Sequence, residues 1–231
     1  KNLLSIKDIE TLFAPMTEKY FGNDELWEKS ESELRKVLNE MGVKYYEAEG
    51  EAAFYGPKID VQVNSAIGHE VTLSTIQLDY QLPERFELEY VDKDGKKARP
   101  VVIHRAILGS LDRFVAFLLE ETKGILPLWL APQQAVVIPV SPEAHGEYAH
   151  HVVEEMRKLG IRVELDDRNE KLGYRIREAQ TSKIPVEIVV GDGEKESNGV
   201  TVRRYGSRQE VKKSMDDFLK DIQEEINSKK M

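Results

Sequence analysis

The stretch PLWLAPQQAVVIPV at 127–140 divides the sequence into two parts with different patterns. Its first half contains Pro127 and Pro132, and such a proline-rich segment predicts a linker between domains. Its second half, AVVIPV at 135–140, is a continuous apolar run, which is typical of a strand buried on both faces. We therefore expect two domains, at residues 1–132 and 133–231.

After this run the chain alternates between strand and helix patterns. Apolar runs predict strands, and amphipathic stretches predict helices. The strands are expected at 135–140, 161–165, 186–191 and 199–204, and the helices at 142–159, 172–182 and 211–228. The order β-α-β-α-β-β-α predicts a compact α/β domain, in which helices flank a small mixed sheet.

Before the run, apolar residues mostly alternate with polar ones. The strands are expected at 43–49, 58–63, 70–80, 86–91 and 99–104. Short turns with Gly and Pro join them, and short turns favour antiparallel pairing. Helices are expected at 24–41 and at 108–121, and the second should point Leu111, Phe114, Val115, Leu118 and Leu119 inward. The first domain is therefore expected to be α+β with an antiparallel sheet. Residues 1–13 have a loosely helical spacing that Pro15 ends.

The composition excludes several classes of protein. Of the 231 residues 40% are apolar, but no apolar stretch reaches the roughly 20 residues that cross a bilayer. The absence of cysteine excludes disulfides, a cysteine nucleophile and thiolate metal ligands within this chain. With no secretory leader visible, we expect a cytoplasmic protein without membrane contact. The chain begins at Lys1 rather than Met, so we expect a fragment of a longer protein.

The charge is acidic overall but locally basic. A net charge of −9 disfavours nonspecific binding to nucleic acid duplexes. Residues 168–183, however, hold five Lys and Arg against two Glu. This segment predicts a basic face that contacts phosphates. The alternative is a solvated helix face stabilised by pairs of opposite charge.

Four longer strings are more specific than the charge pattern, and all four resemble one enzyme family. They are FYGPKID at 54–60, STIQLDYQLPERF at 74–86, RPVVIHRAILGSLDRF at 99–114 and ELDDRNEKLGYRIREAQ at 164–180. They are similar to the C-terminal part of bacterial threonyl-tRNA synthetases, which are class II aminoacyl-tRNA synthetases. The resemblance begins near Lys19, and residues 1–18 do not match. It implies a partial class II catalytic domain at 1–132 and an anticodon-binding domain at 133–231.

The resemblance implies a chemistry and a set of catalytic-domain residues. In this family threonine and ATP form threonyl-adenylate and pyrophosphate, with Mg²⁺ on the phosphates, and the threonyl group then passes to tRNA(Thr). Arg113 matches the motif 3 arginine at the adenine and γ-phosphate, and Lys58 matches a lysine near the α-phosphate. Tyr55, Thr75 and Gln77 match residues around the substrate. Taken alone, a lysine in a turn or an amide in a strand is more often simply solvated.

His104 matches a zinc ligand of the family. A lone histidine at a strand end is more often a hydrogen-bonded structural residue than a ligand. In the family the Zn²⁺ binds the amino and hydroxyl groups of threonine, and its other protein ligands are an upstream Cys and His. Motifs 1 and 2 also precede this region in the family. We therefore expect this polypeptide alone to be inactive, and the full-length protein to be a homodimer.

The second domain has its own family residues. Asn169, Lys171, Lys183, Glu194 and Arg203 fall where the family contacts the anticodon loop. Free base edges suit Asn, Glu and Arg, and phosphates suit Lys. Two other interpretations remain open, a noncatalytic RNA-binding module or paralog, and a half that regains activity with a separate N-terminal part.

Overall fold

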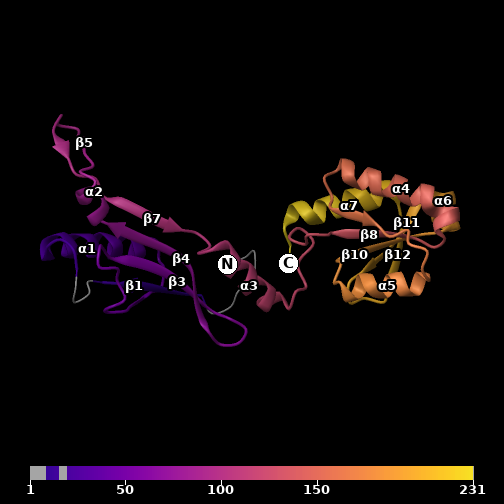
Figure 1. Ribbon diagram of the computed structural model, residues 1–231, viewed down its shortest axis with the longest axis horizontal. Coiled ribbons are helices and arrows are strands. Elements are labelled where there is room, and N and C mark those ends of the chain that lie inside the picture. Colours follow the sequence, from indigo (N-terminus) through magenta and orange to yellow (C-terminus); the bar gives the residue numbers. More distant parts are fainter. Residues whose placement is uncertain (1–8, 16–19, 231) are drawn as a thin grey trace. The chain divides into compact units, whose positions relative to one another are not determined.

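The computed structural model describes residues 9–15 and 20–230, which form two compact units (Figure 1). The N-terminal unit ends at Glu121 and the C-terminal unit begins at Thr122. Among the helices of the described residues, none is long and apolar enough to span a membrane.

The N-terminal unit contains a five-stranded sheet in the order β2-β1-β3-β4-β7. All pairs are antiparallel except β1 with β2. The strands are β1 (Ile9–Ala14), β2 (Tyr46–Glu47), β3 (Lys58–Asn64), β4 (Glu70–Asp79) and β7 (Val102–Ala106). Helix α1 (Asp24–Glu40) packs on one face, where its Leu38 lies in a core cluster with Phe13 and Ile59. The expected antiparallel sheet is thus confirmed.

Residues 9–14 correct one expectation, because they form strand β1 rather than a helix. The strand lies between β2 and β3, so its backbone groups are paired on both sides, and Phe13 is fully buried. Pairing with two neighbours outweighs a weak helical spacing. Residues 1–8, which carry the rest of that pattern, lie outside the described residues.

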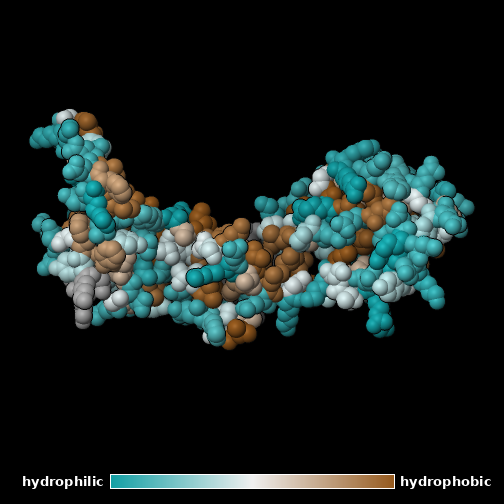
Figure 2. All heavy atoms as spheres, viewed as in Figure 1, coloured by the Kyte–Doolittle hydropathy of each residue, from teal (hydrophilic) through white to brown (hydrophobic). Residues whose placement is uncertain are grey.

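The strand expected at 86–91 is mostly absent. Only Tyr90–Val91 forms a strand, β5, which pairs with β6 (Lys97–Ala98), and the short helix α2 (Gln81–Arg85) precedes them. Helix α3 (Leu111–Thr122) differs only in part from expectation, because Leu118 is buried as expected. Leu111, Val115 and Leu119, however, are exposed. Figure 2 shows apolar side chains at the surface over α3. Such a stripe is typical of a surface that packs against other protein.

The C-terminal unit is the expected α/β domain with a mixed sheet. Its strand order is β12-β11-β10-β8-β9, with β8 parallel to both of its neighbours. The strands are β8 (Ala135–Pro139), β9 (Val163–Leu165), β10 (Val186–Val190), β11 (Gly199–Arg204) and β12 (Glu210–Ser214). Helices α4 (Pro142–Lys158) and α7 (Met215–Ser228) contribute to the larger core cluster, and α5 (Leu172–Thr181) covers the other face of β8.

Two elements of this unit were not expected. Residues 210–214 form β12, so the final helix begins at Met215 rather than at 211. Ser214 explains why α7 begins at Met215, because its side chain accepts a hydrogen bond from Asp217 N–H and caps the helix. A short helix, α6 (Asp192–Ser197), also separates β10 from β11.

The segment expected as a linker packs against the C-terminal unit. Leu128 is 5% exposed and belongs to the larger core cluster. The guanidinium of Arg162 donates to the carbonyls of Trp129 and Ala131 at 3.0 Å or less. The segment that contains the two prolines is therefore held by the domain that follows it. The domain limits 1–132 and 133–231 stay a prediction.

Candidate functional site

Three neighbouring strands place predicted site residues on one face of the N-terminal sheet. In the antiparallel register Lys58 of β3 lies opposite Gln77 of β4, and Gln77 lies opposite His104 of β7. Thr75 lies opposite Asp60. Because residues two apart in a strand point to the same face, these side chains share one face. The opposite face of the sheet packs on α1.

The turn before β3 brings Tyr55 to the same place. Gly56 approaches β4 so closely that a Cβ at this position would lie 1.9 Å from the Leu78 carbonyl oxygen. Glycine is therefore required there, and the backbone can lie directly on the neighbouring strand. The Tyr55 hydroxyl donates to Gln77 Oε1 at 3.2 Å, and its ring centroid is 6.2 Å from that of His104. Tyr55, Gln77 and His104 thus form one cluster.

Asp60 joins two of the predicted residues. Its Oδ2 lies 2.8 Å from Lys58 Nζ, and its Oδ1 accepts from the Thr75 hydroxyl at 2.7 Å. Asp60 is 3% exposed, and a buried carboxylate needs such partners. We did not identify Asp60 from the sequence. Its spacing of two from Lys58 within a strand was the available signal, since it places both side chains on one face.

His104 has a buried carboxylate partner that the sequence analysis also missed. His104 Nε2 lies 2.7 Å from Asp79 Oδ2, and Asp79 is 3% exposed. Asp79 Oδ1 accepts from the backbone N–H groups of Gln81 and Leu82. Burial raises the pKa of Asp79, but the hydrogen bonds from Leu82, His104 and Gln81 outweigh it and leave the pKa below its usual value. The negatively charged carboxylate of Asp79 therefore holds the imidazole of His104 in a fixed position.

Arg113 lies apart from this cluster. It stands in the first turn of α3, where its backbone N–H donates to the Ser110 hydroxyl at 3.3 Å. Its side chain helps to line a hollow of about 500 Å³ together with His69, Thr72 and Phe117. The structure therefore gathers Tyr55, Lys58, Thr75, Gln77 and His104 without Arg113, and the roles of all six residues stay predictions.

In the C-terminal unit, Asn169 and Lys171 lie in the exposed loop between β9 and α5. Arg175 fixes this loop from inside. It is 1% exposed and donates to the carbonyls of Pro139, Asp166 and Glu170 at 2.8, 2.7 and 3.2 Å. Arg175 therefore does not belong to a basic surface, which corrects the charge argument.

Two of the remaining basic residues of 168–183 are also bonded within the fold. Arg168 binds Asp166 and Glu178 at 2.7 and 2.5 Å. Lys183 lies beyond the far end of α5 from Lys171, and its Nζ donates to the Lys123 carbonyl at 2.5 Å. The alternative of a solvated helix face with charge pairs thus describes much of this segment.

Glu194 and Arg203 are both bound within the fold. Glu194 accepts from Gly191 N–H, from the Thr201 hydroxyl at 2.7 Å and from Lys212 Nζ at 3.2 Å. Arg203 lies between two carboxylates, one on each neighbouring strand. The five residues predicted to read the anticodon therefore do not meet at one point, and their roles stay a prediction.

The fall in the free energy of unfolding at low pH tests the structural role of Glu194. Burial raises the pKa of Glu194, but Thr201, Lys212 and Gly191 outweigh it and leave the pKa below its usual value. A lowered pKa adds stability above the ordinary glutamate pKa, and this stability is lost as the pH falls through the folded-state value. We expect Glu194→Gln to make acid unfolding less steep, as measured by urea titrations at several pH values. Exposed Glu196→Gln is the control, and equal slopes for both variants would contradict this role.

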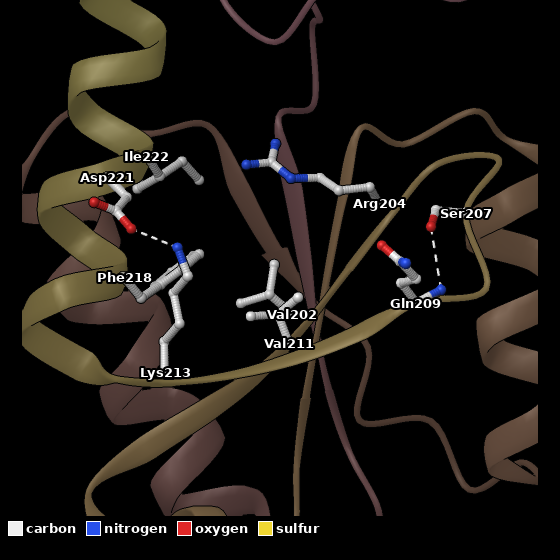
Figure 3. A pocket seen from close by; sticks show the side chains of 9 residues that line it. All are labelled: Val202, Arg204, Ser207, Gln209, Val211, Lys213, Phe218, Asp221 and Ile222. Carbon is white, nitrogen blue, oxygen red and sulfur yellow. Dashed lines mark hydrogen bonds and ion pairs between the residues drawn. The ribbon is translucent and has the colours of Figure 1, made fainter.

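A second hollow lies on the α7 side of the C-terminal sheet (Figure 3). It measures about 170 Å³, and buried Phe218 and Ile222 lie beside Val202 in its lining. Lys213 at its side binds Asp221 of α7. None of the predicted site residues lines this hollow.

Comparison with known proteins matches both units. Residues 10–122 match the family model of the tRNA synthetase class II core domain (G, H, P, S and T), and residues 134–225 match that of the anticodon binding domain. Among curated relatives, the threonine–tRNA ligase of Bacillus velezensis is 61% identical over 88% of this chain and 32% of its own length. That of Lactobacillus gasseri is 56% identical over 92% of this chain and 33% of its own length. The chain thus spans about a third of these relatives.

Solved structures show the same similarity. One is described as the RNA binding domain of threonyl-tRNA synthetase from Cryptosporidium parvum. It has a TM-score of 0.86 and 35% identity, covering 94% of this chain and 55% of that one. A putative threonyl-tRNA synthetase from Aeropyrum pernix has a TM-score of 0.75 and 26% identity, covering 96% and 55%.

The order of the two matched domains defines the class of this protein, since a class II synthetase core is followed by an anticodon-binding domain. The predicted fold class is therefore confirmed. Within that class, the chain belongs to the threonyl-tRNA synthetase family.

Proposed function

We propose that this chain takes part in the ATP-dependent attachment of threonine to tRNA(Thr), as the C-terminal part of a threonine–tRNA ligase. The alignment of Lys58, Gln77 and His104 across three strands is the observation that carries this proposal. It presents an ammonium group, an amide and an imidazole on one polar face, as a site for a charged amino acid and a phosphate requires. The catalytic partners are ATP, threonine and Mg²⁺.

Each residue then has a separate task. Lys58 stabilises the charge that develops at the α-phosphate, and Arg113 binds the nucleotide. Tyr55, Thr75 and Gln77 orient threonine. In this scheme no side chain acts as a nucleophile, because the threonine carboxylate attacks the phosphate directly, and catalysis rests on positioning and charge.

We propose His104 as one ligand of a Zn²⁺ ion. Its bond to buried Asp79 fits this role, since metal-binding histidines commonly donate their other ring nitrogen to a carboxylate. Across residues 9–15 and 20–230, no group of three His, Cys, Asp or Glu could hold a metal ion. Further ligands would therefore come from outside these residues. When bound, the ion supplies a Lewis acid that distinguishes the threonine hydroxyl from a methyl group.

The C-terminal unit is proposed to bind the anticodon loop of tRNA(Thr) through Asn169, Lys171, Lys183, Glu194 and Arg203. The match of residues 134–225 to the anticodon binding domain supports this role. For the whole protein we propose a homodimer in the cytoplasm. The same match also favours a second candidate, in which this chain acts alone as a noncatalytic RNA-binding module.

RNA binding by the 231-residue chain tests the anticodon role. We expect an anticodon stem-loop of tRNA(Thr) to bind about tenfold more tightly than a copy with a changed anticodon, because each lost base contact costs about 1–3 kcal/mol. The measurement is fluorescence anisotropy at two salt concentrations. Equal and strongly salt-dependent binding of both RNAs would reduce the unit to a phosphate-contacting surface.

Aminoacylation separates the two candidate functions. Mixing the chain with the N-terminal part of a threonine–tRNA ligase should restore threonylation of tRNA if the first proposal holds. Specific RNA binding without any restored activity would favour the noncatalytic module.

A further inference from the structure

A row of three charged residues crosses the C-terminal sheet. Glu187 of β10 lies opposite Arg203 of β11, and Arg203 lies opposite Glu210 of β12. The three side chains share the sheet face on which α5 packs, because Glu187 is bound by Gln180 of that helix. The two carboxylates differ sharply in exposure, since the side chain of Glu187 is fully buried and that of Glu210 is 55% exposed.

The buried end of this row is incompletely bonded. Arg203 Nε and Glu187 Oε2 are 3.7 Å apart, which is too long for a hydrogen bond. Both atoms are buried, and within the described residues neither has a hydrogen-bond partner. Burial raises the pKa of Glu187, although Gln180 and Arg203 oppose this shift. Leaving such groups unpaired is costly, so a small movement of the guanidinium toward Glu187 would be favourable.

At the exposed end of the row, Glu210 forms a direct hydrogen bond with Arg203. Arg203 Nη1 donates to Glu210 Oε1 at 2.7 Å. An ion pair with an exposed carboxylate contributes little free energy and is easily exchanged. Glu187 has no exposed surface, whereas Glu210 is half exposed and can turn into solvent. Another hydrogen-bond acceptor can therefore replace Glu210 at Arg203 Nη1.

We propose that Glu187 is a positioning residue, which holds the guanidinium of Arg203 in a fixed direction while Glu210 gives up its place to a base of the bound RNA. This inference rests on the proposed anticodon role of the C-terminal unit. A fixed direction matters for reading a base edge, where donors must match particular acceptors. It matters much less for a phosphate, which any nearby cation attracts.

Gln180 completes the support. Its Nε2 donates to Glu187 Oε1, and its Oε1 accepts from Gly206 N–H at 3.1 Å. Gly206 lies in the turn between β11 and β12. Gln180 of α5 thus bonds both the buried Glu187 carboxylate and the turn that follows Arg203. The same side chain therefore holds two of the groups that surround Arg203.

The test measures the ratio of affinities of the 231-residue chain for the native and changed anticodon stem-loops. We expect Glu187→Gln to reduce this ratio about tenfold, as the loss of one directed base contact does. Arg203→Ala should cause at least the same loss, and the double variant should lose no more than Arg203→Ala alone, because Glu187 acts through Arg203. Exposed Glu224→Gln on α7 is the matched control and should leave the ratio unchanged.

Glu210→Gln tests the exchange step, and it should tighten binding of the native stem-loop and raise the ratio, because Glu210 competes with the native base for Arg203 Nη1. Should Glu187→Gln fail to fold, Glu187→Met replaces the buried carboxylate by an apolar side chain of similar volume. The inference is overturned if a folded Glu187 variant keeps the wild-type ratio while Arg203→Ala loses it. It is also overturned if Arg203→Ala has no effect. A wild-type chain that does not discriminate at all contradicts the proposed anticodon role instead.

Discussion

Replacing Lys58 with alanine should lower threonine-dependent ATP–pyrophosphate exchange by about 10²-fold or more, as the loss of one preorganised charge-stabilising group does elsewhere. The measurement uses the 231-residue chain mixed with the N-terminal part of a threonine–tRNA ligase, as in the aminoacylation test of the proposed function. Lys58 lies opposite Gln77 and is held 2.8 Å from Asp60, so its ammonium group is in place before substrate binds. Because the proposed role of this group is to stabilise developing charge, the rate should fall more than the affinity for threonine.

The same substitution removes the cation beside buried Asp60, so stability must be separated from catalysis. Thr75 would remain as a partner of that carboxylate. The double variant Lys58→Ala, Asp60→Asn removes the unpaired buried charge and should recover much of the stability without recovering exchange. Exposed Lys44→Ala is the control. Recovery of exchange together with stability would show that Lys58 acts only structurally.

The elements that the sequence predicts well have a pattern that does not depend on distant partners. The run at 135–140 forms β8, and the amphipathic stretch expected as a helix at 24–41 forms α1. Both signals are local, one a continuous apolar stretch and the other a helical spacing of apolar residues. Strands β1 and β12 were missed because pairing with neighbouring strands, rather than local periodicity, makes them strands.

The residues of the candidate site also divide into those that the sequence predicts and those that it does not. Lys58, Gln77 and His104 could be identified because they stand in long, specific strings, and the register then brings them together. Asp60 and Glu187 were missed because a sequence shows the charge of a residue but not its burial. A buried carboxylate is noticed only when the strands and helices around it are placed, since burial makes its partners necessary.

Arg175 shows the largest difference between sequence and structure, and Arg175→Ala should destabilise the C-terminal unit by about 3 kcal/mol or more. Its guanidinium donates to four backbone carbonyls, of which that of Pro139 ends β8 and that of Glu170 lies in the loop before α5. Removal takes a donor from these carbonyls, of which that of Pro139 is buried, and leaves a cavity where a side chain was 1% exposed. The measurement is chemical unfolding followed by circular dichroism.

The control is Arg177→Ala, because Arg177 lies on the same helix, carries the same charge and is exposed. It should change the free energy of unfolding by about 0.5 kcal/mol or less. Arg175→Lys should give an intermediate loss, since an ammonium group lacks the planar fork that reaches several carbonyls. If Arg175→Ala unfolded at the same denaturant concentration as Arg177→Ala, the carbonyl contacts would not be what fixes the loop that carries Asn169 and Lys171.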